Sequence, residues 1–242
     1  MVRKLAGGFG FLEGPVFSRL GYLLFCDLAA QRILKWEAGA AGVFRDQSNA
    51  ASGLTFDHQG RLLACERGRV TRTERDGRIT ALAGGMKRPN DVVYAIDGSI
   101  YFTDPPLLYQ VTRTGEVRVA ARDSRLPNGV ALAPNQQKLY VADTAARRIR
   151  LYDIAPDGAL RNGREFAEAE ADGLKTDEEG KVWTTDGQAI SVFDAGGRRI
   201  QRFEMPEMPT NLSWGEGFRN LYVTARTALY HMETKAHGTR TY

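Results

Sequence analysis

The sequence is poor in the residues that usually carry metal binding and nucleophilic catalysis. Its 242 residues include two cysteines and three histidines. Cys26 and Cys65 do not have the spacing of a zinc site, so we expect two reduced thiols in the core. No Gly-x-Ser-x-Gly segment occurs, which argues against a serine nucleophile on a strand-to-helix elbow.

Long apolar segments and basic runs are also absent. Residues 1–8 lack the apolar region of a signal peptide, and no later stretch approaches the length of a membrane span. The 33 Lys and Arg are scattered among 29 Asp and Glu, with a net charge of +4. We therefore expect a soluble, cytoplasmic protein without nucleic-acid or membrane partners. The oligomeric state stays open.

One polar position returns six times along the chain. Its copies are Glu13, Ser52, Asn90, Asn128, Asp172 and Asn211. A second row ends the following strand-like segments 14 or 15 positions later, at Asp27, Glu66, Asp104, Asp143, Asp186 and Ala225. A repeat of about forty residues, made of short strands and turns, is typical of a β-propeller.

The predicted fold is therefore all-β, a six-bladed β-propeller with four-stranded blades. Residues 1–242 are expected to form one domain, with blades that begin near 13, 52, 90, 128, 172 and 211. The sixth repeat stops one strand short, and the stretch around residues 3–6 is the natural candidate to complete the last blade. The polar tail, residues 233–242, is expected to fray.

Equivalent positions of a propeller converge on its central channel, so the first row should form a ring. Two carboxylates and several amide oxygens, without His or Cys, suit a hard divalent cation such as calcium better than zinc. Each Asn taken singly could merely cap a strand-entry turn. The acids of the second row are expected to cap turns after the strands.

The order and spacing of six motifs resemble the SMP-30/gluconolactonase/luciferin-regenerating family, in particular its bacterial lactonase branch. These motifs are Glu13-Gly14-Pro15, Arg88-Pro89-Asn90-Asp91, the segment 99–104, Pro127-Asn128-Gly129, the segment 139–143 and Asp172-Gly173-Leu174. The resemblance extends from about residue 12 to residue 232. It implies a six-bladed propeller that hydrolyses a sugar lactone such as gluconolactone.

The resemblance also implies roles for particular residues. One divalent metal ion would be held by Glu13, Asn128 and Asp172, with Asn90 beside it. The ion would be Ca²⁺, with Zn²⁺, Mg²⁺ or Mn²⁺ as alternatives. Asn90 would also contact substrate, and Arg88 would hold its hydroxyl groups. Asp172, a carboxylate beside the metal, is the candidate general base.

The chain departs from the family in ways that bear on function. It lacks the long insert that usually follows the Thr-Asp-Pro-Pro segment and helps to build the pocket wall and lid. Ser52 stands where bacterial relatives usually have Asn. Two alternatives to a lactonase stay open at this point. One is a promiscuous esterase or phosphotriesterase at the same metal site, and the other is a calcium-binding propeller without catalytic activity.

Overall fold

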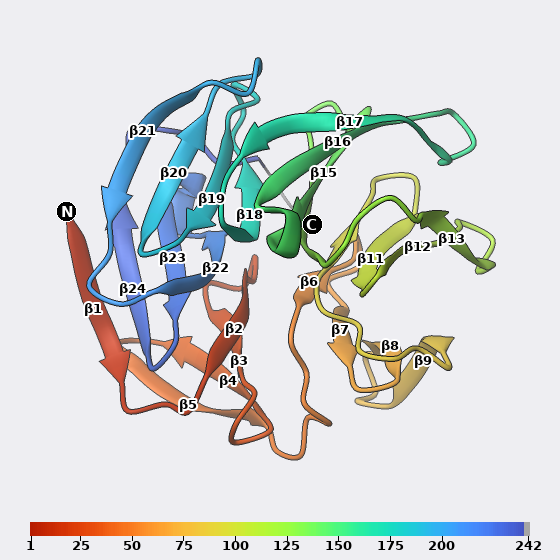
Figure 1. Cartoon of the computed structure of the whole chain (residues 1–242). Helices are drawn as coiled ribbons and strands as arrows, with labels where there is room; N and C mark the ends of the chain where they lie inside the picture. The colour runs from red at the N-terminus through yellow and green to blue at the C-terminus, as the bar shows by residue number, and fades with distance from the viewer. Residues whose placement is uncertain (240–242) are drawn as a thin grey trace.

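Antiparallel strands make up nearly all of the computed structural model, which describes residues 1–239. These residues form six separate sheets of four strands each, and Figure 1 shows the sheets arranged around a common centre. The prediction of an all-β, six-bladed propeller is confirmed. In blades 1 to 5 the four strands follow one another as an antiparallel meander from the innermost strand outward, and in blade 6 the first three strands do so.

The first three blades run in chain order. Blade 1 contains β2 (Leu12–Phe17), β3 (Leu23–Asp27), β4 (Arg32–Glu37) and β5 (Ala40–Arg45). Blade 2 contains β6 (Leu54–Phe56), β7 (Leu62–Glu66), β8 (Arg69–Thr73) and β9 (Ile79–Gly84). Blade 3 contains β10 (Val92–Tyr94), β11 (Ile100–Asp104), β12 (Leu107–Val111) and β13 (Val117–Ala121).

Two short 3-10 helices interrupt the second half of the chain. Blade 4 contains β14 (Pro127–Leu132), β15 (Lys138–Asp143), β16 (Arg148–Ile154) and β17 (Leu160–Glu168), with η1 (Thr144–Ala146) after β15. Blade 5 contains β18 (Ala171–Thr176), β19 (Val182–Asp186), β20 (Ala189–Phe193) and β21 (Arg199–Glu204). Blade 6 contains β22 (Pro209–Trp214), η2 (Glu216–Phe218), β23 (Asn220–Ala225) and β24 (Ala228–Glu233).

The two ends of the propeller meet in blade 6. Strand β1 (Val2–Gly7) pairs antiparallel with β24 and supplies the fourth strand of that sheet. The predicted closure by the N-terminal stretch is thus confirmed. Pairing with β1 satisfies the outer edge of β24, which would otherwise offer unpaired backbone groups to another chain.

Hydrophobic contacts between neighbouring blades hold the ring together. Within the described chain, each of six buried clusters joins residues of two adjacent blades. Leu63 and Val70 of blade 2, for example, pack with Phe102 and Val111 of blade 3. Burial of one such side chain stabilises the fold by about 1.5–3 kcal/mol. Both cysteines are buried and free, as expected.

The acids of the second row hold the loops that lead into the inner strands. Asp143 accepts hydrogen bonds from the backbone amides of Arg125 at 2.8 Å and Leu126 at 2.9 Å. The same kind of bond recurs at Asp27, Asp104 and Asp186. Glu66 binds arginine side chains instead. The predicted capping of the turn after the strand is seen at Asp27 and Asp143, which also accept from the amides of Ala30 at 3.1 Å and Ala146 at 3.3 Å.

Residues 234–239, which follow β24, are tied to the propeller, contrary to the frayed tail predicted for residues 233–242. Gly238 pairs with Asp177 in a β-bridge, and its amide donates to the carbonyl of Phe218 at 2.7 Å. Residues 240–242 lie outside the described part of the chain. None of the helices within residues 1–239 has the length and apolar character needed to cross a membrane.

We predict that Asp143→Ala lowers the free energy of unfolding by about 1–3 kcal/mol, because three backbone amides lose their acceptor. Urea unfolding of wild-type and variant proteins measures the change. Glu37→Ala is the control, because that carboxylate is half exposed and takes part only in a surface ion pair. Equal, small effects of both substitutions would contradict the role assigned to Asp143.

Candidate active site

Strand register defines which residues are equivalent around the channel. The second strand of each blade ends at a second-row residue, namely Asp27, Glu66, Asp104, Asp143, Asp186 or Ala225. The residue three positions before this end pairs with one residue of the inner strand. Those six residues are Val16, Thr55, Val93, Ala131, Lys175 and Ser213. The ring position lies three residues earlier, at Glu13, Ser52, Asn90, Asn128, Asp172 and Thr210.

Blade 6 corrects the predicted ring by one residue. Thr210, not Asn211, is the equivalent of Glu13, because the repeat of blade 6 is one residue longer between its ring position and Ala225. Asn211 occupies the next position along the strand, and its side chain hydrogen-bonds to Glu13 of blade 1. Asn211 therefore supports a ring residue from the adjacent blade.

Glycine fills most of the positions that follow the ring, and close approach of the strands explains why. A Cβ atom on Gly14 would lie 1.9 Å from the carbonyl oxygen of Ser52, and Gly14 also has a φ of +50°. A Cβ atom on Gly129 would lie 2.3 Å from the carbonyl oxygen of Asp172. The inner strands are thus in backbone contact, which fixes the spacing of the ring residues.

Glu13 and Asp172 bring two carboxylates together on the ring. Burial and the nearby charge of Asp172 raise the pKa of Glu13 well above its usual value. Burial and the charge of Asp91 raise the pKa of Asp172 to about 7. The raised pKa values mean that the two carboxylates repel one another in a poorly solvated place, where a bound cation would be favourable.

Asp91 is a third acid at this end of the channel, and the sequence reasoning did not assign it. It is 2% exposed and contributes to the raised pKa values of both Glu13 and Asp172. Its two oxygens accept from the backbone amides of Val92 at 3.0 Å and Val130 at 3.1 Å. Its place directly after Asn90, where four other blades have glycine, was the signal that could have found it.

The two asparagines of the ring are placed differently. The side chain of Asn128 hydrogen-bonds to Asp172 of the next blade. Asn90 is half-buried, and its backbone amide donates to the carbonyl of Thr103 at 2.8 Å. Of the four residues predicted to bind metal, Asp172 interacts with both Glu13 and Asn128, whereas Asn90 has no side-chain contact with them among residues 1–239.

Arg88 lies outside the ring, two residues before Asn90. Its backbone amide donates to Asp104 at 2.5 Å, and its side chain is exposed. The guanidinium group makes no hydrogen bond or ion pair with any residue of the described range 1–239. Arg88 is thus available to an incoming molecule.

The residues equivalent to Arg88 form what we call the rim of the channel. They are Phe11, Ala50, Arg88, Leu126, Glu170 and Met208. The side chains of Phe11, Leu126 and Met208 are 37%, 40% and 43% exposed, so the rim presents three large apolar groups to an incoming molecule. Sequence reasoning missed this rim. The repeat period, counted two residues before each ring position, would have found it in every blade except blade 6, where the one-residue shift hides Met208.

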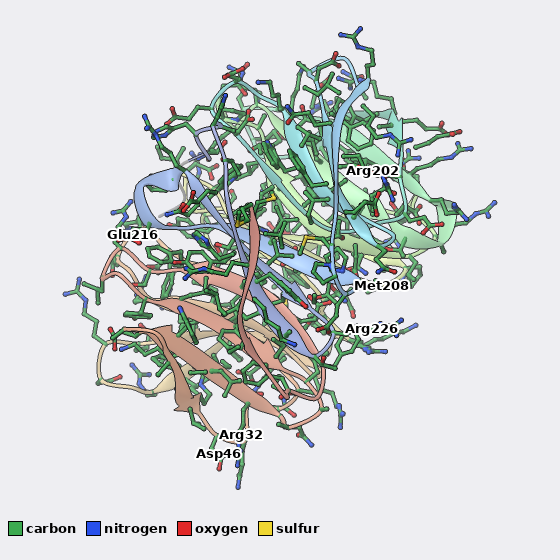
Figure 2. The ribbon with its side chains drawn as sticks, turned by 90° about the vertical axis from the view of Figure 1, so that its left-hand side faces the viewer. Arg32, Asp46, Arg202, Met208, Glu216 and Arg226 are labelled. Carbon is green, nitrogen blue, oxygen red and sulfur yellow. The ribbon has the colours of Figure 1, made fainter. Side chains whose placement is uncertain are left out.

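The rim marks one end of the channel. Met208 precedes β22 and contacts Arg226, whereas Glu216 follows β22, and Figure 2 shows the first two on one side of the molecule and Glu216 on the opposite side. The ring and rim residues therefore lie at the Met208 end. We call this end the mouth.

The donor set of the ring fits a hard divalent cation. Glu13 and Asp172 supply carboxylate oxygens, and Asn90 and Asn128 can supply amide oxygens. Among residues 1–239, no three His, Cys, Asp or Glu side chains form a group able to hold a metal ion. A cation at the ring would therefore need the amide oxygens as well as the two carboxylates. The identity of such a cation stays a prediction.

Comparison with known proteins connects this geometry to one family. The profile described as SMP-30/Gluconolactonase/LRE-like region matches residues 11–227. A gluconolactonase of Zymomonas mobilis is 27% identical, with 98% of this chain and 82% of the relative covered. The alignment spans 295 positions, more than the 242 residues of this chain, so the relative carries insertions that are absent here.

Two further proteins agree with this result. The pentonolactonase XacC of Haloferax volcanii is 27% identical, with 88% of this chain and 80% of the relative covered. A solved gluconolactonase structure from Xanthomonas campestris superimposes with a TM-score of 0.90 at 28% identity. That comparison covers 96% of this chain and 89% of the other.

We predict that Asp172→Asn raises the thermal stability of the protein in chelator by a few degrees. The substitution removes one of the repelling buried charges and keeps an oxygen for Asn128 to contact, and ~1 kcal/mol corresponds to about 2–4 °C in a chain of this size. Added Ca²⁺ should then stabilise the wild type more than the variant. A variant that melts below the wild type in chelator would contradict the repulsion argument.

Proposed function

The chain belongs to the SMP-30/Gluconolactonase/LRE-like family, and from that premise we propose that it hydrolyses a sugar lactone with a divalent cation at the mouth of its channel. Lactonases among its relatives support the class of reaction. The observation that carries the proposal is the meeting of Glu13 and Asp172, two carboxylates with raised pKa values, beside the exposed rim.

The cation would be held by Glu13, Asp172 and the amide oxygens of Asn128 and Asn90, with Ca²⁺ the first candidate. When bound, it would polarise the lactone carbonyl and acidify a water molecule. The chain orients these ligands by itself. The backbone amide of Gly14 donates to Glu13 at 3.1 Å, and Asn211 binds the same carboxylate from the adjacent blade.

Asp172 is the proposed general base. Asn128 fixes its carboxylate by a hydrogen bond, while Thr185 accepts the backbone amide of Asp172 at 3.1 Å. Asp172 takes a proton from a water molecule whose oxygen bonds to the carbonyl carbon. The ring carbon–oxygen bond then breaks, and Asp172 returns the proton to the departing ring oxygen. The product is the open-chain hydroxy acid.

Asp91 has a separate role in this proposal. Each of its oxygens accepts a backbone amide, so its carboxylate is held in place beside the ring. Its charge favours a cation at the ring by the same effect that raises the pKa of Asp172.

The rim suggests how a lactone would be oriented. Arg88 can grip hydroxyl or carbonyl oxygens with its planar set of donors. Phe11, Leu126 and Met208 can pack against the carbon skeleton but offer it no hydrogen bond. We infer that the substrate turns its polar edge toward Arg88 and a C–H face toward these apolar side chains.

We predict that Glu13→Gln and Asp172→Asn each lower kcat/KM for gluconolactone by about 10²–10⁴-fold, because each removes a ligand or the base. Circular dichroism should show that both variants remain folded. Asp153→Asn, an exposed acid of the outer part of blade 4, is the control and should retain wild-type activity. Turnover of gluconolactone by Asp172→Asn at the wild-type rate would contradict the role of Asp172 as general base.

Arg88→Gln should raise KM for a polyhydroxylated lactone about 10–100-fold and leave kcat within a few-fold, because a charged hydrogen bond contributes roughly 1.5–3 kcal/mol to binding. Arg113→Gln, an exposed cation of blade 3 away from the rim, provides the comparison. Initial rates over a range of lactone concentrations separate the two constants. An unchanged KM for Arg88→Gln would remove Arg88 from the binding site.

A further inference from the structure

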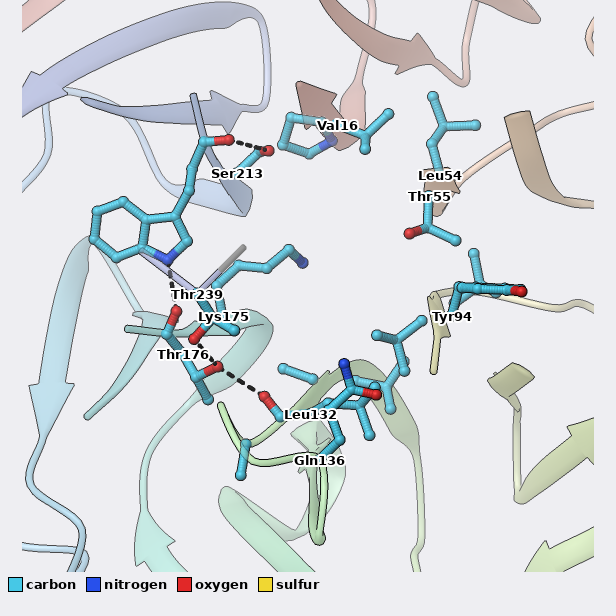
Figure 3. Close-up of a pocket in the computed structure, with 17 residues that line it drawn as sticks. Val16, Leu54, Thr55, Tyr94, Leu132, Gln136, Lys175, Thr176, Ser213 and Thr239 are labelled. Carbon is cyan, nitrogen blue, oxygen red and sulfur yellow. Dashed lines mark hydrogen bonds between the residues drawn. The ribbon is translucent and has the colours of Figure 1, made fainter. Parts of the chain in front are cut away.

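A second feature of the channel lies beyond the ring of oxygens. A cavity of about 50 Å³ is lined by residues from the inner strands of all six blades, and Thr239 of the C-terminal segment also lines it (Figure 3). About 10–15 Å³ of such volume is enough for one water molecule, so this cavity can hold several water-sized occupants.

Lys175 is the one charged side chain among the cavity's lining residues within the described chain, and no Asp or Glu lines it. Its equivalents on the other inner strands are Val16, Thr55, Val93, Ala131 and Ser213. Figure 3 shows the Lys175 side chain extended into the open space between the blades. Lys175 is therefore the one charged residue in a ring of otherwise uncharged equivalents.

Three hydrogen-bond donors face this cavity with bonding capacity to spare. The ammonium group of Lys175 donates to the carbonyl of Leu174 at 3.1 Å, which uses one of its three hydrogens. The side-chain oxygen of Gln136 accepts a hydrogen bond from the backbone amide of Ile96 at 2.7 Å. The NH₂ group of Gln136 is therefore directed away from Ile96 and toward the cavity. The Thr55 hydroxyl has no hydrogen-bond partner among residues 1–239.

The remaining polar groups of the lining are already satisfied by the protein. Ser213 donates to the carbonyl of Trp214 and accepts from the amide of Phe17. Thr176 donates to the carbonyl of Leu132 and shares a hydrogen bond with Thr239. The unused capacity is thus donor capacity with a positive charge, which is the chemistry that recognises an anion.

A positive charge in a confined and mainly apolar space is unfavourable unless an opposite charge accompanies it. Within residues 1–239 the lining supplies none. We propose that the cavity binds one small inorganic anion of halide size, held by Lys175 with Gln136 and Thr55. This site is separate from the oxygens of Glu13 and Asp172 and does not depend on the proposed lactonase activity.

Bromide identifies such a site directly because it scatters anomalously. Wild-type crystals grown or soaked in sodium bromide should show one anomalous peak in the cavity, within hydrogen-bond distance of the Lys175 ammonium group. Crystals of Lys175→Met under the same conditions should lack it. A cavity that contains only water in the wild type, or a peak that persists in Lys175→Met, would overturn the proposal.

Thermal unfolding gives a solution test with a matched control. At constant ionic strength, replacing methanesulfonate by bromide or chloride should raise the wild-type midpoint by about 2–5 °C in a saturable manner. The shift should vanish in Lys175→Met and persist in Lys138→Met, which removes an exposed lysine at the start of β15. Equal halide responses in all three proteins would attribute the effect to general salt action and reject the site.

Discussion

Backbone contact between the inner strands is the constraint on which the rest of the structure depends. The inner strands approach closely around the axis because the residue after the ring position is glycine in four of the six blades. Gly14 and Gly129 have no room for a side chain against the carbonyls of Ser52 and Asp172. This contact brings together residues that are distant in the sequence, so that the charge of Asp172 raises the pKa of Glu13.

Much of this arrangement could be predicted from the repeat alone. Rotational symmetry converts a sequence period into spatial equivalence, so Glu13, Asn128 and Asp172 could be assigned to one ring before any coordinates. The period could not reveal a one-residue shift in blade 6, where a bulge moves Asn211 off the ring. The period also gave no indication of Asp91, whose importance comes from its hydrogen bond with Val130 of the next blade and not from its place in a motif.

Contacts between distant segments account for the other difference. The C-terminal tail is polar, and composition alone favours fraying. In the structure Gly238 instead bridges to Asp177 and bonds to Phe218, two residues that only the ring brings near it. The rim was hidden for a related reason, because Phe11, Leu126 and Met208 share no sequence pattern other than their distance from the ring position.

The way in which β1 completes blade 6 also has a consequence for biosynthesis. Residues 2–7 leave the ribosome before the other strands of the propeller, yet their partner β24 is made after all of those strands. Early blades can collapse against one another while this strand waits without a partner, and the circle closes in a late, long-range step. The chain must therefore tolerate an open, incomplete ring throughout its synthesis, and chaperone demand should be greatest in that interval.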